Sequence, residues 1–265
     1  MRWLTAIATS LALLMFSGGA VLATHAWGPY HWERDSNPLQ LHIGNNLTAY
    51  GSYPSADRSH FDTAMDDWNT SSVLDLTEVD GAGLKNCGAV NGRVEVCNDS
   101  YGFRRGGWLG VATIWADGDH IVKATVQLND TFLGDGGAYA TSAWRQLVMC
   151  QEIGHVFGLD HQDENFNNTN LDTCMDYTNS PDSNQHPNQH DYQELADIYH
   201  HLDTGSGGGG GDGGGNCPPR NPNCANGALK APPFSEASRA NGSVYIDQMR
   251  NGLTRIKHVF WVPRR

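Results

Sequence analysis

The stretch "MCQEIGHVFGLDHQ", residues 149–162, limits the possible folds more than any other part of the chain. It continues a helix with an apolar stripe through Leu147, and the helical period places Gln151, Glu152 and His155 on that same stripe. Polar side chains that face a core need partners, because an unpaired buried polar group costs about 1–3 kcal/mol. A metal ion would supply such a partner, so the stretch predicts a buried polar site.

The spacing of these residues predicts which of them are ligands. Gln151 and His155 are four residues apart, about one helical turn, so their side-chain tips can meet at one point. Gly158 can adopt the left-handed conformation that ends a helix, and the chain can then return His161 to the same point. We therefore expect a metal site with Gln151, His155 and His161 as ligands.

A second motif, "TCMDY" at residues 173–177, follows this stretch. Together the two segments resemble the metzincin clan of zinc endopeptidases (matrixins, astacins and serralysins), whose motif H-E-x-x-H-x-x-G-x-x-H precedes a turn with methionine beneath the metal. This chain has Q-E-I-G-H-V-F-G-L-D-H, which matches every fixed position except the first. The resemblance extends over about residues 37–203 and implies an α/β (α+β) fold of metzincin-like zincin type. Such a fold has a mixed twisted sheet, an active-site helix, the methionine turn and a C-terminal helix.

The resemblance also implies a role for each matching residue. His155 and His161 would ligate one Zn²⁺ through imidazole nitrogen, and Glu152 would be the general base for a zinc-bound water of pKa about 7. Met175 would form the floor of the site. The Met-x-Tyr turn is similar to that of the astacin and serralysin branches, so Tyr177 would stabilise the tetrahedral intermediate.

Gln151, in place of the first histidine, is the one departure from the motif. Its side-chain oxygen has a reach similar to that of a histidine nitrogen, but an amide oxygen is a weaker and harder donor than imidazole. Zinc would therefore be bound more weakly, or would be more electrophilic if retained. His120, His186 or His190 could supply a replacement ligand, and the spacing does not select among them. The presence of Glu152, whose role needs the metal, favours an active enzyme.

The leading prediction is a secreted zinc-dependent metalloendopeptidase that cleaves protein or peptide substrates. The substrate would lie extended along the strand predicted at residues 121–130, while Glu152 assists the attack of water. One alternative is a catalytically silent protein of the same fold that binds peptides without cleaving them, because Gln151 replaces a ligand. A third hypothesis is a surface-associated structural protein that works through its basic tail.

Residues 1–23, "MRWLTAIATSLALLMFSGGAVLA", have the pattern of a secretory signal peptide. A positive Arg2 precedes an apolar run of 13 residues, and the small residues Val21 and Ala23 fit cleavage before Thr24. An uncleaved membrane anchor is the alternative, but a span needs roughly 20 apolar residues. No other segment is apolar enough to cross a membrane. The sequence therefore predicts a secreted protein, extracellular or periplasmic, without a transmembrane span.

All six cysteines follow the signal segment, and an even count in an exported chain favours disulfides. Six cysteines allow 15 pairings, and free buried thiols are the alternative. Nearest-neighbour pairing gives Cys87–Cys97, Cys150–Cys174 and Cys217–Cys224. The middle pair would tie the helix to the methionine turn and so enforce the geometry of the site.

A glycine-rich segment at residues 204–215 cannot pack a core and predicts a flexible linker. It would separate a main domain at residues 24–203 from a small basic module at residues 216–265. Net charge divides in the same way, with −19 between the signal segment and residue 216 and +6 beyond it. So acidic a body argues against nucleic acid as a partner. Within the module, Asn251-Gly252 between two apolar runs predicts a β-hairpin.

Apolar patterns in the main domain predict strands and helices that alternate early and end in a helix, as in a mixed α/β sheet. The expected strands lie at residues 39–44, 73–79, 93–98, 108–117 and 121–130. The expected helices lie at residues 59–72, 138–157 and 188–202. The acidic stretches "ADGDH" and "DHQDENFNNTNLD" could hold Ca²⁺ through carboxylates and amides, although solvated loops have the same composition.

Overall fold

The computed structural model describes residues 25–47, 59–103, 106–203, 224–225, 228–229, 233–237 and 242–263. The predicted signal peptide and the glycine-rich linker lie outside these residues. Cys217 lies outside them as well, and with it the predicted pair Cys217–Cys224. In the described part of the chain, no helix is long and apolar enough to cross a membrane.

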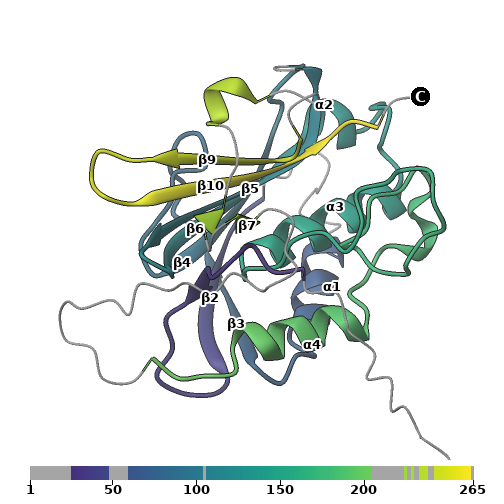
Figure 1. Cartoon of the computed structure of the whole chain (residues 1–265). Coiled ribbons are helices and arrows are strands. Elements are labelled where there is room, and N and C mark those ends of the chain that lie inside the picture. Colours follow the sequence, from purple (N-terminus) through teal and green to yellow (C-terminus); the bar gives the residue numbers. More distant parts are fainter. Residues whose placement is uncertain are drawn as a thin grey trace, which may run out of the picture.

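Eight strands of the described chain form one mixed sheet (Figure 1): β1 (His31–Trp32), β2 (Leu39–Asn46), β3 (Leu74–Asp80), β4 (Arg93–Asp99), β5 (Trp108–Asp117), β6 (His120–Asn129), β9 (Val244–Gln248) and β10 (Thr254–Trp261). The order across the sheet is β3-β2-β4-β6-β5-β10-β9, and β1 pairs with the beginning of β6. Strands β3, β2, β4 and β6 are parallel, whereas β5, β10 and β9 each run antiparallel to the preceding strand. The predicted mixed α/β class is confirmed.

Three helices lie together on one side of the sheet (Figure 1): α1 (Ser59–Trp68), α3 (Ser142–His155) and α4 (Gln189–Ile198). The shorter elements are α2 (Asp130–Leu133), the 3-10 helices η3 (Pro181–Ser183) and η4 (Phe234–Glu236), and the two-residue strands β7 (Cys224–Ala225) and β8 (Ala228–Leu229). All strands and helices predicted for the main domain are present, with ends that differ by a few residues. Local periodicity was sufficient to find them.

The main core fills the space between the sheet and the helices. Trp68 at the end of α1 and Phe157 after α3 are fully buried, with ring centroids 5.9 Å apart in an edge-to-face arrangement. Nε1 of Trp68 donates a hydrogen bond to the carbonyl of Cys150 at 3.1 Å, which fixes α1 against α3. Apolar side chains of β4, β5 and β6 belong to the same core. The helix that carries the predicted site is therefore held by a packed sheet and a neighbouring helix.

The position of β6 contradicts one prediction. β6 contains the strand that was expected to bind an extended peptide, but β4 and β5 occupy both of its edges. That expectation is wrong, because strand addition needs a free edge. The far edge of β5 is occupied as well, since β10 pairs with it from Thr254 to Trp261. A peptide strand could be added beside β5 only if β10 moved away.

β9 and β10 form an antiparallel hairpin that turns at Asn251-Gly252, where Gly252 has a φ of +88°. The sequence placed this hairpin beyond a linker, and the structure bonds it directly to β5 of the main sheet. In this register His258 lies opposite Ala112 of β5 and Val244 of β9. The hairpin therefore places His258 beside β5, the strand that packs against α3.

Two of the three predicted disulfides are confirmed. Cys87 is bonded to Cys97 at the end of β4, and Cys150 of α3 is bonded to Cys174, the residue before Met175. In both pairs the Cα atoms are 5.9 Å apart, which lies in the usual range for a disulfide. The second bond ties the middle of α3 to the methionine turn.

Candidate metal centre

α3 begins at a capped N-terminus and carries the polar residues of the site near its other end. The side chain of Thr141 accepts a hydrogen bond from the backbone N–H of Trp144, which satisfies one free donor of the first turn. Gln151, Glu152 and His155 are 0, 0 and 1% exposed. They face the core, as the helical period predicted.

The chain reverses its direction directly after α3. Gly158 has a φ of +103°, and a Cβ there would collide with the carbonyl oxygen of Tyr30. The backbone N–H of Trp27 donates to the carbonyl of Gly158 at 2.8 Å, so the N-terminal segment is bound to this turn. The reversal returns His161 to the end of the helix, where its Nε2 lies 3.0 Å from Nε2 of His155.

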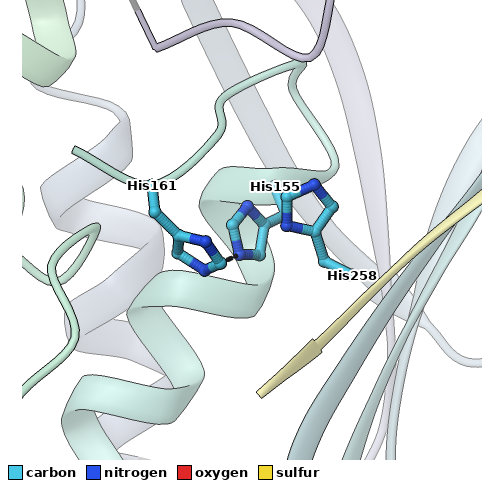
Figure 2. Close-up of side chains that lie close together, drawn as sticks. All are labelled: His155, His161 and His258. Atoms are coloured by element: carbon cyan, nitrogen blue, oxygen red, sulfur yellow. Dashed lines mark hydrogen bonds between the residues drawn. The ribbon is translucent and has the colours of Figure 1, made fainter. Parts of the chain in front are cut away.

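Three histidines from separate elements converge at this point (Figure 2). His155 lies at the end of α3, His161 in the loop that follows, and His258 on β10. Each offers one ring nitrogen, and these three nitrogens all lie within 4.8 Å of one another. His258 is the member that sequence analysis missed. It follows His161 by 97 residues and lies beyond the glycine-rich segment.

The protons on two of the rings follow from their other contacts. Nδ1 of His155 lies 2.8 Å from the carbonyl oxygen of Leu159, which can only accept, and 3.4 Å from Nε1–H of Trp27, which can only donate; the shorter contact places a proton on Nδ1. Nδ1 of His161 lies 3.0 Å from Oε1 of Glu164 and carries a proton for the same reason. In the neutral rings the two Nε2 lone pairs therefore point at each other. A cation between them would remove this repulsion, and backbone and carboxylate partners at Nδ1 are typical of metal-bound histidines.

The carboxylate that orients His161 is ionised. Burial alone would raise its pKa, but hydrogen bonds from His161 and Ser243 lower the pKa of Glu164 to about 2. Oε1 of Glu164 therefore accepts a hydrogen bond at neutral pH and holds the ring of His161 in one tautomer. The free Nε2 of that ring stays directed at the cluster.

His258 completes the set with a ring that has free nitrogen atoms. Neither ring nitrogen has a hydrogen-bond partner within the described ranges, and the ring stacks on Trp27 at a centroid distance of 3.5 Å. Oδ1 of Asp160 lies 3.7 Å from Nε2, which is too far for a hydrogen bond. Burial, and then the neighbouring His155 and His161, lower the pKa of His258 well below its usual value. A neutral imidazole is the form that binds a metal.

A weak signal for His258 is present in the sequence. In "TRIKHVFW" the side chains of Ile256, His258 and Phe260 share one face of the strand. Ile256 and Phe260 both belong to the main core, and His258 is 1% exposed. A histidine between two core positions of a strand is therefore the pattern that points to a ligand.

Gln151 is also buried, but the cluster contains three imidazole ligands without it. Neither its side-chain oxygen nor its nitrogen has a hydrogen-bond partner in the described structure. The replacement ligands considered from the sequence lie elsewhere, beside Asp203 (His120), Asp67 (His186) and His25 (His190). His258 is thus the histidine that the fold brings to the cluster.

Glu152 lies against β5, where a glycine makes room for it. A Cβ at Gly110 would lie 2.5 Å from Oε1 of Glu152, so any larger residue would displace the carboxyl group. Neither carboxyl oxygen has a hydrogen-bond partner among the residues that the structure describes. Burial raises the pKa of Glu152 well above its usual value. A divalent cation nearby would favour the ionised form and bring the pKa down again.

Met175 packs against the last turn of α3, and Tyr177 lies beside His161. Met175 is fully buried, and a Cβ on Gly154 would lie 2.7 Å from its sulfur, so it packs directly under the last turn of α3. The ring of Tyr177 lies 4.2 Å from that of His161. Its hydroxyl donates to the carbonyl of Val259 at 3.4 Å, next to His258. Burial, together with nearby carboxylates, raises the pKa of Tyr177 well above its usual value, so it remains a hydroxyl donor.

A cavity of about 440 Å³ lies between the methionine-turn region and the C-terminal hairpin. Its walls include Glu164 and Tyr177, which both touch His161, and the aromatic rings of Phe166 and Trp261. It mixes apolar rings with polar groups, as small-ligand and peptide pockets do. The cavity therefore borders two residues that contact His161, although the three histidines themselves are not among its lining residues.

No protein-family model matches the chain, and a search of curated proteins found no match. The fold and the site alone show a mixed α/β protein with a candidate metal centre of three histidines. Imidazole nitrogen suits zinc, copper, iron and nickel, whereas calcium and magnesium prefer oxygen. The donor set thus fits a divalent transition metal.

Proposed function

We propose that the protein is a secreted zinc-dependent endopeptidase of the metzincin type in which His155, His161 and His258 hold the zinc ion. The opposed Nε2 atoms of His155 and His161, with a free imidazole of His258 beside them, are the observation that carries this proposal. Three protein ligands are the usual number for a catalytic zinc site. The signal-like N-terminus and two disulfides support export.

The chain supplies the remaining catalytic groups. His155, His161 and His258 would hold the zinc ion, which when bound would supply Lewis-acid chemistry to water and to a peptide carbonyl. Glu152, on the same helix as His155, is the base that accepts the proton of the attacking water and passes it to the leaving amine. The cavity beside Glu164 and Tyr177 would receive the substrate. In this arrangement Gln151 is a buried neighbour of the base and not a ligand.

Metal content and peptidase activity of the purified chain test this proposal. We expect zinc to be retained after dialysis and casein or gelatin to be cleaved. Glu152→Gln should lower the cleavage rate by about 10²–10⁴-fold and leave the zinc content unchanged. His258→Ala should lose both. A folded protein that holds no metal and cleaves nothing would show that the proposal is wrong.

A second candidate function is a peptide- or protein-binding protein that keeps the metal and does not hydrolyse its ligand. Two observations favour it: Glu152 is fully enclosed, and β10 covers the edge of β5 where a peptide strand could be added. The two functions differ in a direct measurement. Full zinc occupancy without any turnover of casein, gelatin or a peptide library would support binding alone, whereas loss of turnover in Glu152→Gln would exclude it.

A further inference from the structure

A second group of histidines shares no residue with the first. His31 belongs to β1, His120 is the first residue of β6, and His201 and Asp203 follow α4. Nε2 of each histidine approaches the same atom, Oδ1 of Asp203, at 3.5, 3.3 and 3.3 Å respectively. The donor atoms of His31, His120 and Asp203 all lie within 4.8 Å of one another, whereas His201, whose Nε2 is also close to Asp203, does not belong to this group.

A metal ion accounts for this arrangement better than hydrogen bonds between neutral groups do. Nε2 of His31 and Nε2 of His120 are within hydrogen-bond distance of Oδ1 of Asp203, which occupies its two lone-pair sites and leaves none for His201. Nδ1 of His31 lies 2.8 Å from the carbonyl oxygen of Pro29 and so carries a proton. His31 could then donate from Nε2 only as a cation. A neutral His31 turns the lone pair of Nε2 toward the carboxylate, which is unfavourable without a cation between them.

A divalent metal ion resolves both conflicts. Two ligand atoms at 2.0–2.1 Å from a tetrahedral zinc ion are about 3.3 Å apart, close to the three nitrogen–oxygen distances around Asp203. The outer partners are also those of a metal site: Pro29 fixes the tautomer of His31, and the backbone N–H of Arg34 donates to Oδ2 of Asp203 at 2.8 Å.

We propose that His31, His120 and Asp203 form a second metal site that holds a structural zinc ion, and that the exposed ring of His201 turns toward the ion as its fourth ligand. Three imidazoles and one carboxylate would then fill all four tetrahedral positions with protein atoms, which is the pattern of a structural and not a catalytic zinc. The side chains of His31 and Asp203 are 10 and 8% exposed, whereas those of His120 and His201 are 38 and 40% exposed, so the ion can enter from the surface.

The site would join three parts of the chain that are distant in sequence. β1 and the start of β6 are held together by only two residue pairs, His31 with His120 and Trp32 with Ile121. The segment after α4 is attached to the same place through Asp203. A bound ion would therefore fasten the N-terminal segment, which also carries Trp27, the ring that stacks on His258. Metal binding at the second site would thus help to hold Trp27 against His258 of the first site.

Metal content of the full-length chain tests the proposal. Zinc per chain is measured after dialysis for the wild type, for the double variant His120→Ala/His201→Ala, and for the control His200→Ala. His200 is the neighbour of His201, and its Nδ1 bonds the carbonyl of Asp197 instead of Asp203. We expect the double variant to lose one zinc equivalent relative to the wild type and the control to lose none.

Cobalt substitution provides an independent readout. Co²⁺ in a tetrahedral nitrogen and oxygen site absorbs strongly in the visible region. The double variant should lose the part of this absorption that comes from the second site and keep the part that comes from cobalt bound by His155, His161 and His258. If the double variant does not fold, His201→Gln, at a partly exposed position, replaces it in both measurements. Equal zinc content and equal cobalt spectra in the wild type and the variants would overturn the second site. That result would leave the first site unaffected.

Discussion

The two histidine clusters differ in how far water reaches them, and this difference decides what each can do. His155 and His258 are 1% exposed, and Glu152, on the same helix as His155, is fully buried. In the second cluster the side chains of His120 and His201 are 38 and 40% exposed. Without metal, the second cluster can be solvated, whereas the first leaves polar groups in the core. The first should therefore depend much more strongly on its ion.

The largest expected effect is that of His258→Ala. The change removes one proposed ligand and leaves a cavity beside Trp27, so we expect loss of zinc from the first site and of peptidase activity. The free energy of unfolding should fall by about 2–4 kcal/mol, as for other large-to-small changes in a core. Zinc analysis and urea unfolding measure both effects.

Lys257→Ala is the matched control for this variant, because Lys257 is the adjacent residue on β10 and its side chain points to the other face. It should keep zinc, activity and most of the stability. Equal losses in the two variants would mean that His258 acts through the strand and not as a ligand.

Glu152→Gln should separate activity from stability. Gln has nearly the shape of a protonated glutamate, and burial already raises the pKa of Glu152 in the metal-free fold. The variant should therefore be at least as stable as the wild type without metal, although its peptidase rate falls by about 10²–10⁴-fold. Thermal unfolding in EDTA, together with a casein assay on the zinc-loaded protein, measures the two properties. A large loss of stability would indicate that the carboxylate has a structural role.

The pH dependence of the metal-free protein should be moderate and should have a definite sign. Burial lowers the pKa of His155 and of His258 well below 6.5, so below about pH 6.5 the unfolded chain binds more protons than the folded chain. Their contribution to stability is complete above that pH and is lost as the pH falls toward the folded pKa values. Glu152, with its raised pKa, acts in the opposite direction above about pH 4.5.

Glu152→Gln removes this opposing contribution. The melting temperature of the metal-free variant should therefore fall more steeply between pH 6.5 and 4.5 than that of the wild type. Melting curves at several pH values in EDTA measure the two slopes. A shallower slope in the variant would contradict the assigned burial of either the histidines or the glutamate.

The smallest effect is expected in the second cluster. His201→Ala removes a partly exposed ring, so in EDTA its stability should lie within about 0.5 kcal/mol of the wild type. In excess zinc the wild type alone should gain the full stabilisation that comes from metal binding to the folded state. Melting curves with and without zinc measure this difference. An equal gain in both proteins would show that His201 is not a ligand.

The sequence predicted the parts of the site that are local in the chain. Periodicity placed Gln151, Glu152 and His155 on the buried face of α3, and nearest-neighbour pairing found the bond between Cys150 and Cys174. These features depend on contacts over a few turns or one loop. The mixed α/β class followed from the alternation of strands and helices in the same way.

The sequence did not predict the parts of the site that depend on strand pairing across long distances. Neither the edge position of a strand nor the partner of a hairpin is determined by local pattern, because both depend on which other strands are present. β6 was expected to bind an extended peptide but has both edges paired, and the hairpin with His258 was expected in a separate module. His258 was missed for this reason, although it is the residue that we propose as a ligand in place of Gln151.

The separation between His161 and His258 has a consequence for the order of events during synthesis. At about 5–20 residues per second, a 97-residue interval delays His258 by roughly 5–20 s after His161 has been made. During that time α3 and its loop can fold while only two of the three imidazoles exist. With the three ligands proposed for the first site, stable uptake of metal would wait until β10 has joined the sheet. Such a chain would acquire its metal late, as one of the last steps of its maturation.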